Sequence, residues 1–167
     1  FDWTDVAHPK EIAFFDRGPV DSTRMASGGT WSAYWYNGAI VSSEIARGLD
    51  ILELAPSGLI SQNEIDAAKT VHFDYLNTQG QPKLVWPPSF SLARAYVDQL
   101  ERSNGLAAGQ IASVRQALTS AESASGSARG SALTKLAATI DADASKSSDA
   151  GKVRKLASAV KELSAAK

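Results

Sequence analysis

The sequence WSAYWYNGAIVSSEIARGLDILEL, residues 31–54, decides the fold of this chain. Apolar and polar residues alternate along it, which is the pattern of a half-buried β-strand. The alternation breaks at Asn37-Gly38, a pair that favours the tight turn of a hairpin, and again at Arg47-Gly48. The stretch therefore predicts a three-stranded antiparallel meander, with strands over 31–36, 39–45 and 49–54.

A meander this short cannot bury its own two faces, so it needs more sheet from this chain or from another one. Upstream, the sequence EIAFFD at residues 11–16 predicts one further short strand, closed by the turn at 16–19. The two outer strands would still have free edges, which natural proteins avoid. We therefore expect the sheet to meet a partner that these residues do not supply.

The composition of the chain changes near residue 96. All thirteen aromatic residues lie at or before Tyr96 and all six prolines at or before Pro88, whereas the rest is rich in Ala, Ser, Leu, Lys and Val. Helix formers without Pro favour helices, and β-branched and aromatic residues favour strands. We expect an α+β chain with a meander region over 1–56, a short helix and extended linker over 57–88, and a helical bundle over 89–167.

Local signals place the helices. A capping box at Ser61 to Glu64 predicts a short helix over about 62–71, and Ser89 and Asn104-Gly105 predict the two ends of the next one. Apolar residues spaced three and four apart predict four helices with short Ser/Gly connections, as in a small up-down bundle. The four apolar stripes are Leu92, Tyr96, Val97 and Leu100; Ile111, Val114 and Leu118; Leu133, Leu136 and Ile140; and Val153, Leu156, Val160 and Leu163.

The net charge of −1 conceals two oppositely charged parts. Residues 1–56 hold four Lys or Arg and eight Asp or Glu, whereas residues 89–167 hold eleven and seven. The two parts could attract each other or face different partners, or they could simply be two solvated surfaces. The basic C-terminal end has no aromatic residue near it, so we expect no nucleic-acid partner. No run of about 18 apolar residues occurs, and we expect no membrane span.

No residue pattern predicts a catalytic, metal or cofactor site. The chain has no Cys, and His8 and His72 each lack a second ligand residue nearby. Asp141 and Asp143 would diverge on a helix, and Gly28-Gly29 is not followed by the Lys-Ser/Thr of a phosphate loop. We therefore expect no catalytic residue, no metal and no cofactor.

The aromatic residues Trp31, Tyr34, Trp35, Tyr36 and Trp86 form the candidate interaction surface. In a strand, Tyr34 and Tyr36 share one face, and Trp31 and Trp35 share the other. Aromatic residues on both faces indicate that both faces are covered, as in stacked sheets. The alternative is a platform on one face for a carbohydrate or a protein.

Residues 38–54 resemble the repeat of bacterial LVIVD-repeat proteins. In that repeat a Gly-led strand and a short Gly turn precede a strand of the type Leu-x-Ile-h-Asp/Glu-h, where h is hydrophobic, and here the last strand is LDILEL at 49–54. Residues 4–12 are similar to the linker of such repeats, and residues 61–100 look like the C-terminal ends of large secreted members. The resemblance implies a β-propeller blade region that requires further blades from a longer chain or a partner. It carries over no catalytic residue.

These observations lead to one expected function and one alternative. We expect a non-enzymatic structural or protein-interaction module of a secreted or cell-envelope bacterial propeller protein, working within a larger protein assembly. Because the chain begins with Phe1 and not with Met, we also expect either that an N-terminal part was removed or that the chain is a piece of something longer. The alternative is the C-terminal part of a secreted enzyme whose catalytic residues lie outside this chain.

Overall fold

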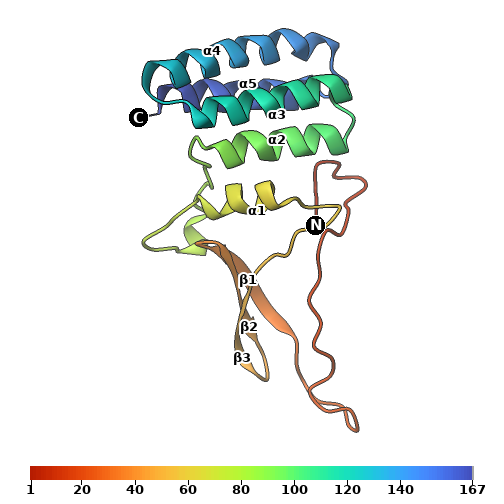
Figure 1. The fold of residues 1–167 in the computed structure, drawn as a ribbon. Helices are drawn as coiled ribbons and strands as arrows, with labels where there is room; N and C mark the ends of the chain where they lie inside the picture. Colours follow the sequence, from red (N-terminus) through yellow and green to blue (C-terminus); the bar gives the residue numbers. More distant parts are fainter. Residues whose placement is uncertain (167) are drawn as a thin grey trace.

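The structure is a computed structural model, and it describes residues 1–166 as an α+β fold (Figure 1). A three-stranded sheet precedes five α-helices, so the predicted fold class is confirmed. The strands are β1 (Thr30–Tyr36), β2 (Ala39–Glu44) and β3 (Gly48–Leu52). The helices are α1 (Gln62–Lys69), α2 (Phe90–Arg102), α3 (Ala108–Ser123), α4 (Gly126–Asp143) and α5 (Ala150–Ala165), with short 3₁₀ turns at Thr78–Gly80 and Ala144–Lys146.

The sheet is the predicted meander. Its strands lie in the order β1-β2-β3 and pair antiparallel, with Trp35 opposite Ile40 and Ile40 opposite Leu52. Asn37 and Gly38 both have positive φ, at 48° and 93°. A two-residue loop with that geometry has the twist that suits a hairpin, which explains why Asn-Gly stands there.

The predicted strand over residues 11–16 is wrong. The structure has no strand there, and the residues before β1 form only one isolated bridge, between Asp2 and Lys10. This part of the chain runs as a long extended segment beside the sheet (Figure 1). An extended segment becomes a strand only when its N–H and C=O groups meet a partner strand, and none of the described residues supplies one.

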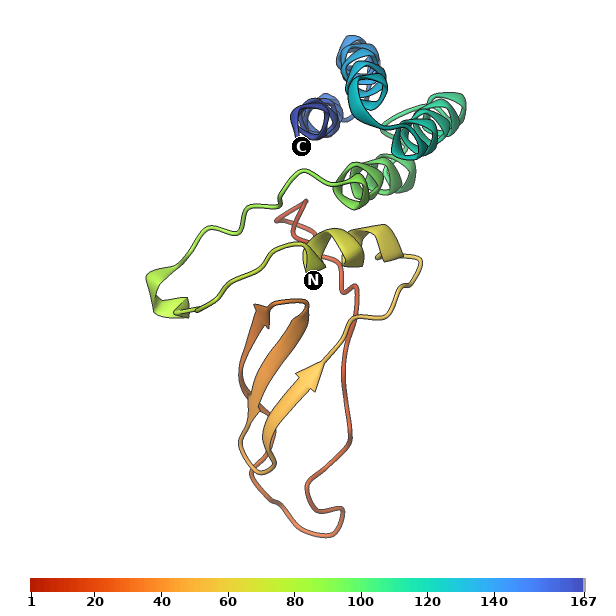
Figure 2. The ribbon, with the colours of Figure 1, turned by 60° about the vertical axis from the view of Figure 1, so that its left-hand side comes forward.

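The helices α2 to α5 form the predicted up-down bundle. The chain reverses direction at each short connection, and α5 returns to lie against α2, which closes the ring (Figures 1 and 2). Leu100, Leu118, Leu133, Ile140 and Leu156 are among the largest fully buried side chains. The apolar stripes read from the sequence therefore supply the core, although Leu92 and Tyr96 in α2 are only partly buried.

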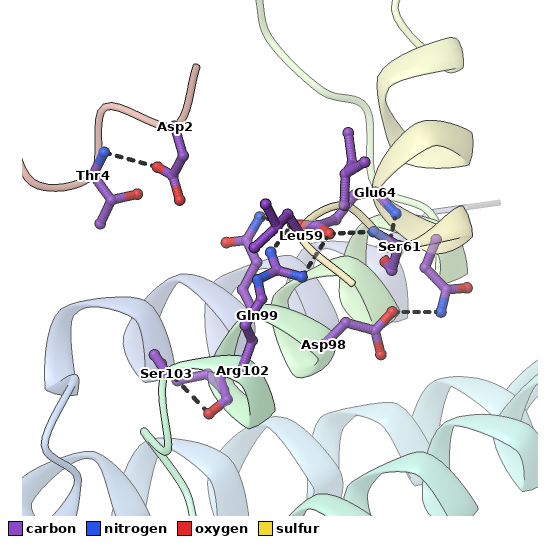
Figure 3. A network of polar contacts seen from close by, with 12 residues as sticks. Asp2, Thr4, Leu59, Ser61, Glu64, Asp98, Gln99, Arg102 and Ser103 are labelled. Carbon is purple, nitrogen blue, oxygen red and sulfur yellow. Dashed lines mark hydrogen bonds and ion pairs between the residues drawn. The ribbon is translucent and has the colours of Figure 1, made fainter. Parts of the chain in front are cut away.

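The helix α1 joins the sheet part to the bundle by packing on α2. Its predicted capping box is present, because the Ser61 hydroxyl accepts from the N–H of Glu64 and the Glu64 carboxylate accepts from the N–H of Ser61. The same carboxylate accepts two hydrogen bonds from Arg102, at 2.6 and 3.1 Å, and one from Gln99 at 2.9 Å (Figure 3). One side chain therefore both starts α1 and binds it to α2.

Candidate functional site: the open face of the sheet

The strand register sorts the sheet residues into two faces. Opposed residues of an antiparallel pair lie on the same face, and the face alternates along each strand. We call one of them the open face. It consists of Ser32, Tyr34 and Tyr36 from β1, Ala39, Val41 and Ser43 from β2, and Leu49 and Ile51 from β3. None of these eight residues carries a charge.

The other face, here called the latched face, holds both acidic residues of the paired strands. Glu44 lies opposite Gly48 in the register, and Asp50 lies opposite Ser42. The Glu44 side chain is almost fully buried, and Asp50 forms an ion pair with Arg17. Both carboxylates are thus occupied by contacts with the segment that precedes β1 or with the β2–β3 turn.

Glu44 organises the end of the latched face. One carboxylate oxygen accepts from the N–H of Gly29 at 2.6 Å, and the other accepts from the N–H groups of Ala46, at 2.9 Å, and of Arg47. The Gly29 N–H, helped by the other two, holds the pKa of the Glu44 carboxyl below its usual value, although burial would raise it. The carboxylate therefore ties the turn to the start of β1.

The segment over residues 14–29 covers this end of the latched face. The guanidinium of Arg47 donates to the carbonyl of Pro19 at 3.1 Å, and a Cβ added to Gly28 would lie 2.4 Å from Val20 and 3.4 Å from the Glu44 carboxylate. A hollow of about 480 Å³ lies between the segment and the sheet. The hollow is lined by three arginines, Arg17, Arg24 and Arg47. Each forms an ion pair with an acidic residue of the same chain.

The open face has no such cover. Tyr34 is 46% exposed, Leu49 61% and Ile51 67%. The remaining members are partly buried, and the hydroxyls of Ser32 and Ser43 contact each other at 2.9 Å. This face is therefore an uncharged, mainly apolar surface that ends at the free edges of β1 and β3.

The candidate aromatic residues take different places. Tyr34 and Tyr36 share the open face and Trp35 lies on the latched face, as the alternation predicts. Trp31 falls at an irregularity in the register between Thr30 and Ser32, which sets it apart from the regular alternation, and it is 80% exposed. Trp86 is 42% exposed and belongs to the segment between the 3₁₀ turn and α2, outside the three strands. The structure therefore does not unite all five residues in one patch.

Within residues 1–166 the open face has no cover, so the expected cover of both faces is not supplied by these residues. Seventeen large hydrophobic side chains in the structure are at least about one-third exposed, and all of them lie at or before Trp86. Conversely, no hydrophobic residue before Ile65 is buried, whereas the bundle buries its own stripes. Large exposed apolar patches mark interaction sites in soluble proteins. The three strands thus form a sheet, but no buried hydrophobic core lies against it.

Two further hollows lie outside the sheet. One of about 600 Å³ lies between the N-terminal residues and α2, but its Arg102 is held by Glu64 and its Lys152 faces Asp149 at 3.7 Å. The other, of about 590 Å³, is a shallow apolar groove between α3 and α4 floored by Val114 and Leu136. Residues 1–166 contain no group of three or more His, Cys, Asp or Glu that could hold a metal ion. In the same range no helix combines the length and the apolar character that crossing a bilayer requires.

Comparison with known proteins gives no relative for this chain. No protein-family model, no curated protein and no solved structure matches it. The feature of the molecule that bears on function is the contrast between the uncovered open face and the closed helical bundle.

Proposed function

We propose that this chain is a non-enzymatic structural or protein-interaction module in which the sheet becomes part of a larger β-structure, and the helices form a compact appendage. The further sheet would be the neighbouring blades of a β-propeller of the LVIVD-repeat type, in a secreted or cell-envelope protein. Those blades come from a longer chain or from a partner.

The observation that carries the proposal is the distribution of buried apolar residues. Hydrophobic burial is the main driving force for folding, and a three-stranded sheet needs a covered apolar face to be stable. Here no hydrophobic side chain of β1, β2 or β3 is fully buried, yet the strands carry Tyr, Trp, Val, Ile and Leu. Such a sequence fits a sheet whose cover is another polypeptide segment.

The size of the uncovered surface supports the same proposal. On average about three-fifths of each of these seventeen side chains is exposed, which amounts to on the order of 1,500 Å² over residues 1–86 at about 150 Å² for a whole side chain. A stable interface uses about 800 Å² on each partner. The front part of the chain therefore has enough apolar surface for a stable association.

Amide hydrogen exchange tests the proposal directly. It is measured on the 167-residue chain alone and on the polypeptide assembly isolated from its natural source, with the mass of each determined by light scattering. We expect the amides of β1 to β3 to exchange quickly in the chain alone and slowly in the assembly, while α2 to α5 are protected in both. A 17.6 kDa monomer whose sheet amides are already as slow as those of the bundle would overturn the proposal.

A further inference from the structure

We infer that Asn37 is a deamidation site whose reaction is controlled by the contact between the sheet and the helices, and that the product no longer forms this contact. The site is the Asn37-Gly38 pair in the turn between β1 and β2, whose Asn side chain forms two hydrogen bonds with Phe73. This modification site lies at the attachment of the sheet to the helical part and does not depend on the proposed function.

The chemistry needs only water. The main-chain nitrogen that follows an Asn attacks the side-chain Cγ and closes a succinimide ring, and the side-chain nitrogen leaves as ammonia with the proton of the attacking N–H. Water then opens the ring, adding OH to a carbonyl carbon and H to the ring nitrogen, and Asp or iso-Asp remains. Gly favours the attack because it has no Cβ to shield its nitrogen. Of the four Asn residues in the chain, Asn37 and Asn104 precede Gly.

In the folded chain, both ends of the Asn37 amide are held by one residue. The side-chain nitrogen, which is the leaving group, donates to the carbonyl of Phe73 at 3.0 Å, and the side-chain oxygen accepts from the N–H of Phe73 at 2.8 Å. Ring closure draws Cγ towards the nitrogen of Gly38 and expels the group that Phe73 holds. Both hydrogen bonds therefore have to break before the reaction proceeds.

Asn104 is protected in a different way. The attacking nitrogen there would be that of Gly105, and its N–H donates to the carbonyl of Leu100 at 2.7 Å. Gly105 is buried, and a Cβ added to it would lie 2.6 Å from the side chain of Leu100, which is itself fully buried in the bundle. The nitrogen is freed only when the end of α2 leaves this core, and a packed core opens less readily than a joint near the surface. Asn37 is therefore the first of the two sites to react in the folded chain.

The product does not restore the joint. A carboxylate only accepts hydrogen bonds, so Asp at this position keeps the bond from the Phe73 N–H and loses the donor to the Phe73 carbonyl. Iso-Asp also lengthens the main chain by one atom, in a turn that fits two residues with φ of 48° and 93°. Gly38 already lies close to Lys69, since an added Cβ would be 3.1 Å from the Lys69 Cγ. The reaction thus replaces a reversible contact by a permanently weakened one.

Peptide mapping by mass spectrometry tests the control of the reaction. The 167-residue chain is kept at mildly alkaline pH, both folded and unfolded in urea, and the conversion of Asn37 and Asn104 is followed with time. Exchange of the Phe73 amide is measured in the same folded sample. Because both reactions pass through the same opening, we expect folding to slow deamidation of Asn37 and exchange of the Phe73 amide by a similar factor, and to slow Asn104 more.

Three results would overturn the control by the joint. In the first, Asn37 reacts equally fast in the folded and the unfolded chain. In the second, Asn104 is converted before Asn37 in the folded chain. In the third, folding protects Asn37 far better than it protects the Phe73 amide.

The Phe73→Pro variant changes the joint and leaves the Asn37-Gly38 pair intact. Proline has no N–H, so one of the two hydrogen bonds is lost. Phe73→Ala is the matched control, because it also removes the aromatic ring but keeps the N–H. We expect Asn37 to deamidate roughly two- to tenfold faster in Phe73→Pro than in Phe73→Ala, which is the range that one hydrogen bond covers. Equal rates in the two variants would overturn the inference.

The deamidated chain tests the effect of the product. The iso-Asp form is separated by ion exchange, and its amide exchange is compared with that of the unmodified chain. We expect the Phe73 amide to exchange at least about tenfold faster, because both hydrogen bonds of the joint are affected. The Gly105 amide at the end of α2 is the internal control and should not change. Unchanged exchange of Phe73 would show that the joint re-forms after the reaction and would overturn its one-way character.

Discussion

Asn37 and Phe73 form a closed pair of hydrogen bonds that fixes the sheet to the segment after α1. The side-chain amide of Asn37 donates to the carbonyl of Phe73 at 3.0 Å, and its oxygen accepts from the N–H of Phe73 at 2.8 Å. Asn37 also occupies the left-handed region, with φ of 48°. One residue thus serves both the hairpin turn and the joint between sheet and helices.

The Asn37→Gly variant separates these two roles. Gly keeps the positive φ without strain but removes both hydrogen bonds, each worth about 0.5–1.5 kcal/mol. We expect the amide of Phe73 to exchange roughly tenfold faster, since about 1.4 kcal/mol corresponds to a factor of ten. The Asn37→Asp variant keeps the acceptor and should fall between. Unchanged Phe73 exchange in Asn37→Gly would show that the pair does not hold the joint.

The sequence predicted the elements that depend on neighbours along the chain. The Asn37-Gly38 turn, the capping box of Ser61 and the cap of α2 by Ser89 all join residues at most three apart, and each is present. The strand over residues 11–16 was wrong because a strand depends on a partner that can lie anywhere. Local alternation cannot reveal whether that partner exists.

The candidate site likewise combines features that follow from local spacing with contacts that only the fold creates. The alternation of Tyr34, Trp35 and Tyr36 between faces followed from local spacing, and the register confirms it. The ion pair of Arg17 with Asp50 on the latched face and the joint between Asn37 and Phe73 span 33 and 36 residues. Charge and residue type mark such groups in the sequence, but the pairing requires the fold.

Paired core and surface variants test the contrast between bundle and sheet. Leu156 in α5 is fully buried, so Leu156→Ala should destabilise the 167-residue chain by about 2–5 kcal/mol in urea unfolding. Ile51→Ala on the open face should change it by less than about 0.5 kcal/mol, because an exposed side chain loses little on truncation. A large effect of Ile51→Ala in the chain alone would mean that the open face has a cover within these residues.

The Glu64 carboxylate should make the stability of the contact between α1 and α2 depend on pH. Burial would raise the pKa of Glu64, but hydrogen bonds from Arg102, the N–H of Ser61 and Gln99 outweigh it, and the pKa is lowered. The stability that Glu64 contributes is therefore fully present above the pKa of its carboxyl in the unfolded chain, near 4.5. It is lost as the pH falls through the lower pKa of the folded state.

The Glu64→Gln variant measures that contribution. A hydrogen bond to a charged group is worth about 1 kcal/mol more than a neutral one, so the variant should be destabilised by about that amount or more at pH 7. It should also lose less stability than the wild type between pH 7 and pH 3, as followed by urea unfolding. Glu162→Gln is the matched control, because the Glu162 carboxylate accepts from Ser158 on the surface of a single helix. Parallel pH curves for Glu64→Gln and the wild type would contradict the assignment.

Glu44 gives the corresponding prediction for the latched face. Its carboxylate accepts from the N–H groups of Gly29, Ala46 and Arg47, and these hold its pKa below the usual value. As the pH falls through that lowered pKa, protonation weakens the acceptor and the start of β1 should loosen. We expect the Gly29 amide to exchange several-fold faster in Glu44→Gln at neutral pH, after correction for intrinsic rates. The exposed Glu53, just after β3, provides the control Glu53→Gln, which should leave Gly29 unchanged. A Gly29 amide that exchanges at the wild-type rate in Glu44→Gln would contradict the role of this carboxylate at the start of β1.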